Sequence, residues 1–282
     1  MTDRASAIAE LSTDDPLTQP FQGSSPYDEY VRATLLNTLQ EPLTDAADEM
    51  GFLVTTQVME LWFTLIVHEW RAARESFRAD ELDTAMDALL RSRRGLQALN
   101  SSWAPIAALT PVQFNGFRAA FGKASGFQSA MQRHMEFLIG QKSTALLRAH
   151  SGDPDVHKGL SEAHEEPSLY DEVLRFLHRQ GLPVPEHVLT RDVTEPYSSD
   201  PGVVEVWRQV YAGDQRHPLL RLGELLTDVA ETITRWRLDH VMVVRRAMGS
   251  KPGSAGSAGV KYLEKRAAIP VFPELWEARG AM

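Results

Sequence analysis

The segment HPLLRLGELLTDVAETITRWRLDHVMVVRRAMG, residues 217–249, is the longest helical pattern in the chain. Its apolar residues recur at intervals of three and four, the spacing that places side chains on one face of an α-helix. Residues 50–77 carry a second long pattern, apolar enough to be buried on more than one side. We find no strand alternation and no internal repeat. The sequence therefore predicts an all-α fold.

Shorter segments extend this prediction along the chain. Helical patterns occur at residues 25–39, 80–103, 125–142 and 168–182. Gly181 follows the last of these patterns and predicts the end of that helix. Residues 1–25 are rich in Ser, Thr, Asp, Pro and Gln, and we expect a mobile arm there; the proline-rich residues 183–202 are expected to form a loop within the fold. The predicted organisation is one helical domain over residues 26–282, preceded by the arm.

Composition narrows the classes of function. The chain has 282 residues, a net charge of −9 and no cysteine. The acidic charge argues against nonspecific binding to nucleic acid or to an anionic membrane. The lack of cysteine excludes disulfides, Cys-ligated zinc, iron–sulfur clusters, a cysteine nucleophile and thiolate-bound heme. No apolar run approaches the length of a membrane span, and the N-terminal residues lack the pattern of a signal peptide, so we expect a cytoplasmic protein.

Nine histidines raise the question of a metal site, but their spacing does not support one. Neither the HExxH motif of zinc peptidases nor the Glu-x-x-His pair of di-iron bundles is present. His150, His157 and His164 recur every seven residues in polar surroundings, which favours a solvated surface. His68 and His134 lie in amphipathic segments, where a partly buried histidine at the rim of the core is the ordinary interpretation.

His240 differs from these because it interrupts an apolar stripe. It lies seven residues after Ile233, four after Trp236 and four before Val244, so its imidazole shares their helix face. The helix alone leaves two interpretations open. One is a core histidine bonded to a carbonyl group. The other is an axial ligand of heme iron, a neutral imidazole in an apolar pocket.

The small-residue segment KPGSAGSAG, residues 251–259, follows this helix directly. Gly/Ser segments commonly link domains, yet only residues 260–282 come after this one, too few for another domain. Glycine lets a backbone approach a ligand closely, and Ser254 and Ser257 offer hydroxyl groups. We therefore interpret the segment as a binding loop, which favours the ligand role of His240.

Several motifs, in the same order, resemble the tryptophan 2,3-dioxygenases, a family of tetrameric heme enzymes that open the indole ring. The most similar segments are SGFQSAMQRHMEFLIG at 125–140 and DHVMVVRRAMGSKPGSAGSAGVKYLEK at 239–265. FLVTTQVMELWF at 52–63 is similar to the family helix F-I-x-x-H-Q-x-x-E-L-W, and GSAGSAG at 253–259 to the loop Gly-Thr-Gly-Gly-Ser-Ser-Gly. The resemblance implies an all-α fold, heme b with O2 as co-substrate, a tryptophan-like substrate and a homotetramer.

The resemblance also implies roles for individual residues. His240 falls on the proximal heme ligand, and Trp103 on an aromatic residue near the heme. Arg118 falls on the arginine that binds the substrate carboxylate, for which a planar guanidinium is suited. Ser254, next to Gly253 at the start of the loop, falls on the threonine that bonds the amino-acid head group.

Four further positions concern the pocket and its closure. Ser125 falls on a serine at the distal heme face, and Phe52 on an aromatic residue that packs against the indole. Tyr27 and Tyr30 fall on positions that reach into the pocket of a neighbouring subunit. For the aromatic residues, core packing is the competing interpretation. The loop would act as a lid over the substrate and exclude water from the site.

Two positions depart from the family pattern. Thr56 stands where the family has a distal histidine, and Phe114 where it has a tyrosine near the carboxylate. Threonine accepts a hydrogen bond but does not act as a base near neutral pH. We expect oxygen insertion from O2 into the indole ring of L-tryptophan or a substituted tryptophan, for example a β-methyl derivative. Two alternatives stay open: monooxygenation at indole C2 to a 2-oxindole in secondary metabolism, and a non-catalytic heme sensor.

Overall fold

The computed structural model describes residues 19–253, 256 and 258–282. These residues form helices joined by turns and contain no strand, which confirms the predicted all-α fold. The chain divides into two compact units, Met1–Glu41 and Pro42–Met282, which are described separately. The domain boundary expected after residue 25 stays a prediction.

The first unit contains two short helices, α2 (Pro26–Val31) and α3 (Ala33–Leu36). Ser25 begins α2, because its hydroxyl oxygen accepts a hydrogen bond from the Asp28 backbone N–H at 3.1 Å. Neither helix contains a buried residue.

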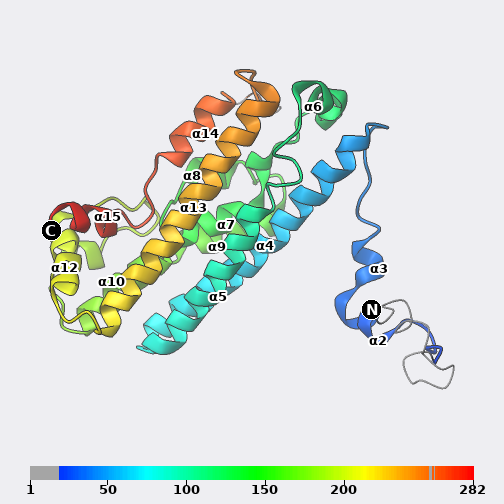
Figure 1. Cartoon of the computed structure of the whole chain (residues 1–282). Helices are drawn as coiled ribbons and strands as arrows, with labels where there is room; N and C mark the ends of the chain where they lie inside the picture. Colours follow the sequence, from blue (N-terminus) through cyan, green and yellow to red (C-terminus); the bar gives the residue numbers. More distant parts are fainter. Residues whose placement is uncertain (1–18, 254–255, 257) are drawn as a thin grey trace, which may run out of the picture. The chain divides into compact units, whose positions relative to one another are not determined.

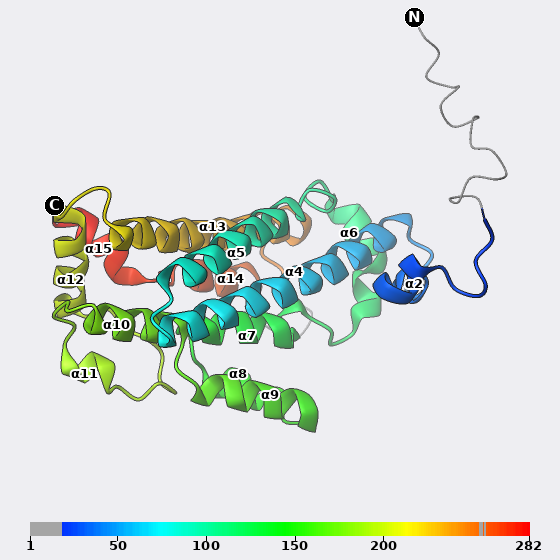
Figure 2. The ribbon, with the colours of Figure 1, turned by 90° about the horizontal axis from the view of Figure 1, so that it is seen from below.

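Three long helices form the body of the second unit: α4 (Ala47–Arg78), α5 (Leu82–Ser101) and α13 (Pro218–Met248). They lie side by side along the molecule (Figures 1 and 2). Residues 79–81 join α4 to α5 as a tight turn, so these two helices are antiparallel. Helix α13 is parallel to α5, since Asn100 near the end of α5 contacts Thr232, and Trp103 farther along the chain contacts Trp236 and His240. The first turns of α4 and the last turns of α13 therefore lie toward the same end of the bundle, beyond the end of α5. We call it the site end.

Shorter elements close the bundle around these three. They are α6 (Pro111–Arg118), η2 (Ala119–Phe121), η3 (Gly126–Gln128), α7 (Ala130–Leu138), α8 (Thr144–Arg148), α9 (Pro154–Glu165), α10 (Leu169–Arg179), α11 (Glu186–Leu189), α12 (Pro201–Ala212), α14 (Val260–Ala267) and α15 (Pro273–Gly280). Helix α6 lies at the site end, and α12 and α15 pack together at the opposite end (Figure 2). The expected loop at 183–202 is broken by α11 and by the start of α12, whose first turn Asp200 caps.

Aromatic side chains hold the long helices in register. The Trp70 indole N–H of α4 donates to Ser92 Oγ of α5 at 3.0 Å inside the core. Phe63 of α4 meets the Trp236 ring of α13 edge to face, with centroids 5.6 Å apart. Asn100, near the end of α5, donates from Nδ2 to the Thr232 carbonyl of α13 at 3.1 Å. These contacts fix how the three helices are aligned at the site end.

Helix α4 is also long and apolar enough to cross a membrane, with a mean hydropathy of 1.5 over its best 18-residue window. The sequence-based statement that no apolar run approaches the length of a membrane span is therefore wrong. Ile66, Trp70 and Phe77 of this helix are fully buried against the bundle, as in the core helix of a globular protein. Only 28% of the apolar window is buried within the chain, however.

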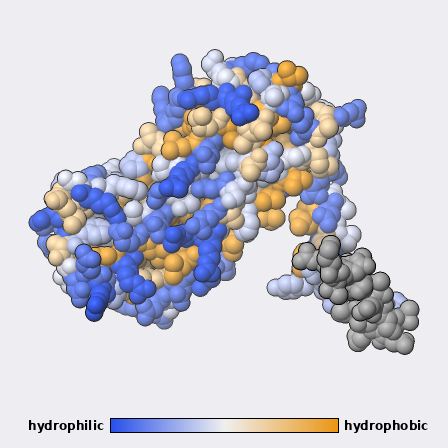
Figure 3. All heavy atoms as spheres, viewed as in Figure 1, coloured by the Kyte–Doolittle hydropathy of each residue, from blue (hydrophilic) through white to orange (hydrophobic). Residues whose placement is uncertain are grey.

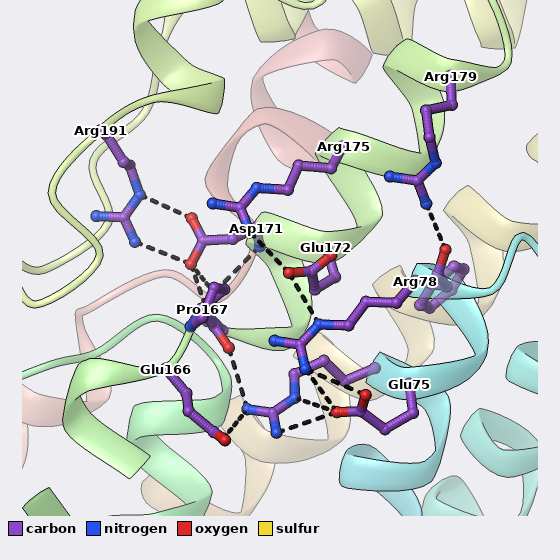
Figure 4. Close-up of polar contacts among 12 residues, drawn as sticks. Glu75, Arg78, Glu166, Pro167, Asp171, Glu172, Arg175, Arg179 and Arg191 are labelled. Carbon is purple, nitrogen blue, oxygen red and sulfur yellow. Dashed lines mark hydrogen bonds and ion pairs between the residues drawn. The ribbon is translucent and has the colours of Figure 1, made fainter. Parts of the chain in front are cut away.

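An ionic network joins α4 to α10 away from the site end (Figure 4). Glu172 of α10 is buried and pairs with Arg78 of α4 at 3.2 Å and with Arg175 at 2.7 Å. Asp171, also buried, receives the Arg191 guanidinium at 2.7 Å. Each buried carboxylate is thus neutralised by a guanidinium, as burial of charge requires. Gly181 adopts a φ of +88° just past α10, which confirms the predicted end of that helix.

Lys142 is a buried cation whose side chain caps the C-terminal end of α9. Its ammonium donates to the carbonyl oxygens of Ala163, His164 and Glu166 at 2.5, 3.1 and 2.8 Å. These are among the carbonyls that a helix C-terminus leaves without an internal partner. Burial lowers the pKa of Lys142 to about 8. This value is still above neutral pH, so the ammonium stays mostly protonated and can donate to the three carbonyls.

We predict that Lys142→Met lowers the free energy of unfolding by about 3 kcal/mol, since buried carbonyls left without donors cost ~1–3 kcal/mol each and relax only in part. Urea denaturation followed by circular dichroism measures the change. Lys158→Met, at an exposed position of α9, is the matched control and should leave the midpoint unchanged. Equal shifts in the two variants would show that Lys142 does not hold the helix end.

Candidate active site

His240 lies in the last third of α13, at the site end, among aromatic rings. Its imidazole is half-buried and stacks on the Trp103 indole, with centroids 4.9 Å apart and planes 28° apart. The Trp236 ring lies 5.7 Å away on the same helix. Burial lowers the pKa of His240 to about 4, so the imidazole is neutral at physiological pH. No hydrogen bond joins this ring to another residue in the part of the chain that the structure describes, so the alternative of a core histidine bonded to a carbonyl finds no partner.

Two indole N–H groups beside His240 lack acceptors. The Nε1 atoms of Trp103 and Trp236 are buried and have no hydrogen-bond partner among the described residues. A buried donor without an acceptor costs ~1–3 kcal/mol, so natural proteins seldom leave one unpaired. A heme would use both features, because its iron takes a neutral imidazole and its propionates accept N–H donors. The residues around His240 therefore fit the cofactor that the sequence predicts.

Four phenylalanine rings gather where α4 meets α6. Phe52 of α4 lies 6.0 Å from Phe114, 5.5 Å from Phe117 and 5.1 Å from Phe121, measured between ring centroids. Phe114, Phe117 and Phe121 also contact one another. We call these four residues the phenylalanine cluster. Sequence analysis identified Phe52 and Phe114 but missed Phe117 and Phe121, although the spacing 114, 117, 121 is itself a helical stripe.

Thr56 lies one turn after Phe52 on α4 and is half-buried. Its hydroxyl donates to the Leu53 carbonyl oxygen at 2.8 Å, and the Phe52 carbonyl oxygen lies at 3.1 Å. Because the single hydroxyl proton is used within the helix, the oxygen keeps lone pairs that can accept a hydrogen bond from a ligand. Thr56 can thus serve as an acceptor in this site but not as a base.

Arg118, the last residue of α6, holds the start of the small-residue loop. Its Nη2 atom donates to the Pro252 carbonyl oxygen at 2.5 Å, and Lys251 Nζ lies 3.4 Å from Asn115 Oδ1. A pocket of about 310 Å³ opens beside these contacts. It is lined by Asn115, Arg118, Ala119, Gly122 and Gly253. A guanidinium with further N–H donors at a small polar pocket is suited to a carboxylate. Ser254, the predicted head-group residue, lies outside the described residues.

The ends of the loop meet each other. Gly259 has a φ of +58°, and a Cβ at that position would lie 2.5 Å from the Lys251 carbonyl oxygen. Only glycine allows this close approach in a left-handed conformation. The loop therefore begins and ends at neighbouring positions, Lys251 and Gly259. This geometry is typical of a compact loop and not of a linker between domains.

The other predicted positions are less connected. Ser125 is half-buried just before η3, and its backbone N–H donates to Gln128 Oε1 at 3.1 Å. No hydrogen bond between described residues links Ser125 to the phenylalanine cluster or to His240. Tyr27 and Tyr30 lie in the first unit on α2, where their side chains are 67% and 90% exposed.

The predicted burial of the other histidines needs correction. His164 is not on a solvated surface: it is buried, with its ring edge-on to Phe137 at 5.4 Å, and burial lowers its pKa. His150 and His157 are half-buried. His134 is half-buried, as predicted, and lies 3.2 Å from Arg71 Nη2. His68 is exposed, so the prediction that it is partly buried is wrong. No group of three or more His, Asp or Glu residues that could hold a metal ion occurs among the described residues.

The family model and the relatives of known name that match this chain belong to one family. A family model described as tryptophan 2,3-dioxygenase matches residues 12–210 and 205–282. A tryptophan 2,3-dioxygenase of Bradyrhizobium diazoefficiens is 41% identical over 90% of this chain and 91% of its own. The enzymes of that name from a Polaromonas species and from Bordetella pertussis are 40% and 39% identical, over 92% and 99% of this chain and 88% and 97% of their own.

Proposed function

Because the chain belongs to the tryptophan 2,3-dioxygenase family, we propose that its site end binds heme through His240 and tryptophan through Arg118. The protein is an oxidoreductase that oxygenates tryptophan. The single observation that carries the assignment of the site concerns the described residues: among them, the neutral imidazole of His240 has no hydrogen-bond partner and lies beside two indole N–H donors that lack acceptors.

Heme b would be the cofactor, and His240 would supply the imidazole that binds its iron. The Trp103 indole N–H, which is buried and has no acceptor among the described residues, would donate to a heme carboxylate. When bound, the heme supplies the iron at which O2 is activated for insertion into the indole ring. The protein contributes an uncharged ligand and an apolar, aromatic wall, which keep water from the reacting centre.

The substrate carboxylate binds at the Arg118 pocket. The guanidinium retains donors beyond the one given to Pro252, and a charge-assisted bond to a carboxylate is about twice as strong as a neutral one. Gly253 lines the same pocket, which puts the loop backbone against the head group. Ser254, the next residue, keeps the hydroxyl of the family threonine and would bond the same group.

The indole ring packs on the phenylalanine cluster, with Phe52 as its main contact. Thr56, one turn along α4, accepts the indole N–H, since its own proton is already donated to Leu53. Phe114 contributes only packing, because it lacks the phenol of the family tyrosine. We assign Ser125 to the distal heme face, as the resemblance implies.

The protein assembles as a homotetramer through apolar surface on its long helices. Exposed apolar side chains run along α4 at Met50, Val54, Leu61 and Leu65. Figure 3 shows apolar atoms among the polar ones on the side of the body where α4 runs. Exposed apolar surface of this extent marks an association site. Tyr27 and Tyr30 complete the pocket of a neighbouring subunit.

We place the tetramer in the cytoplasm, in keeping with its acidic charge and lack of cysteine. Of the alternatives left open by the sequence, neither monooxygenation in secondary metabolism nor a non-catalytic heme sensor has support from the relatives, which are named tryptophan 2,3-dioxygenase. Activity assays with L-tryptophan and with β-methyl tryptophan would show which of the two is the substrate.

We predict that the reduced, heme-loaded protein converts L-tryptophan to N-formylkynurenine with both atoms of labelled O2 in the product, measured by mass spectrometry. His240→Ala, which removes the axial ligand, should lose the heme absorption band and all product. A product with one labelled atom would overturn dioxygenation, and an unchanged heme spectrum in the variant would overturn the assignment of His240.

We predict that Arg118→Ala weakens tryptophan binding about 10- to 100-fold, the range expected for the loss of charge-assisted hydrogen bonds, while heme content is unchanged. Equilibrium dialysis of the ferric protein with labelled tryptophan measures this without turnover. Arg235→Ala, at an exposed arginine of α13 paired with Glu231, is the control. Equal affinities of the wild type and the Arg118 variant would exclude the carboxylate role.

We predict that Leu61→Glu reduces the tetramer to smaller species, because a charge would have to be buried at the interface without a partner. Sedimentation velocity measures the assembly state. A variant that sediments as the wild type would place the interface away from this face of α4.

A further inference from the structure

The Phe121 ring lies on Phe52 as a ligand ring would. Their centroids are 5.1 Å apart and their planes 23° apart, the only near-parallel pair among the four phenylalanines of the cluster. Offset stacking of this kind is the arrangement that flat aromatic groups prefer. Phe52 is the residue assigned to hold the indole. One face of that ring is therefore already covered by a side chain of the same protein.

The open pocket does not offer the indole another place. Its described lining is polar or small, and contains no aromatic side chain. Along α6 and η2, residues 115, 118, 119 and 122 share the side that lines this pocket, while 114, 117 and 121 share the adjacent side that faces α4. Arg118 lines the pocket and directly follows Phe117 of the cluster in the chain. A tryptophan whose carboxylate binds to Arg118 can therefore direct its ring into the phenylalanine cluster.

Among the four rings, Phe121 lies on the shortest helix. Phe114 and Phe117 are buried on α6, the latter only 1% exposed, and Phe52 is on the long helix α4. Phe121 is half-buried and ends the three-residue helix η2. Gly122 follows with a φ of +56° and nothing within 4 Å of the place where a Cβ would be. No side chain therefore fills the space beside Gly122, while the Phe121 carbonyl oxygen accepts a hydrogen bond from the Ala124 N–H at 2.8 Å.

We propose that Phe121 occupies, in the ligand-free protein, the place on Phe52 that the indole ring takes, and that tryptophan must displace it to bind. This inference rests on the proposed function, since it assumes that Arg118 and Phe52 receive the substrate. It makes Phe121 a residue that sets the affinity of the tryptophan site.

The exchange of one ring for another lowers the affinity of the site. A ligand gains the stacking contact on Phe52 only after Phe121 has lost the same contact. This displacement has one free-energy cost, whichever ring replaces Phe121, so it weakens the binding of tryptophan and of phenylalanine by the same factor. Association is also slower, because the site must open first.

The test compares the ferric, heme-loaded wild type with Phe121→Ala and Phe121→Leu. Equilibrium dialysis measures Kd for L-tryptophan and L-phenylalanine, and stopped-flow absorbance measures the association rate. We expect Phe121→Ala to bind tryptophan about 2- to 10-fold more tightly, the range of one aromatic contact, with faster association and the same fold gain for phenylalanine. Phe121→Leu keeps more of the packing, so its affinity for tryptophan should lie between those of the wild type and Phe121→Ala. It also guards against misfolding of the alanine variant.

Weaker binding of tryptophan by both variants would overturn the inference, because Phe121 would then be a wall that supports the bound indole. Unchanged affinity and association rate would overturn it as well. Failure of the proposed function is distinguishable, since it appears as absence of labelled product from the wild type. Phe127→Leu, at a half-buried phenylalanine that contacts Tyr262 outside the cluster, is the control and should bind as the wild type does.

Discussion

The Trp236 ring is the contact on which the site end depends. It meets Phe63 of α4 edge to face, lies 5.7 Å from Trp103 after α5, and is one turn from His240 on α13. One buried side chain thus ties all three long helices together at the level of the imidazole. Since a core of this density does not deform continuously, the position of His240 relative to α4 is set by packing and not by a polar contact of its own.

Buried polar groups are satisfied within the chain where α4 meets α10, since the carboxylates of Asp171 and Glu172 are each paired with arginine. At the site end, the N–H groups of Trp103 and Trp236 have no acceptor among the described residues. Six further buried side-chain atoms of the described residues also lack a hydrogen-bond partner, among them the Tyr211 hydroxyl of α12. The two indoles differ from these because they flank the His240 imidazole, and this position supports the proposed cofactor site.

The sequence predicted the parts of this structure that follow from periodicity. The long helices and the end of α10 at Gly181 were predicted from spacing and glycine chemistry alone. The buried position of His164 was not, because its neighbours in sequence are polar and the ring that covers it, Phe137, comes from another helix. Phe121 was missed for a similar reason. Its importance comes from contact with Phe52, some seventy residues earlier, which no local pattern records.

The departures at Thr56 and Phe114 have a common consequence for recognition. Both lie beside Phe52, and both replace a polar ring with a group that offers no base and little hydrogen bonding to the substrate. In the proposed site, polar recognition would fall to Arg118, whose guanidinium already holds the Pro252 carbonyl. A carboxylate bound there would meet a residue attached to the loop, whose ends come together at Gly259. Head-group binding and placement of the loop would then use the same side chain.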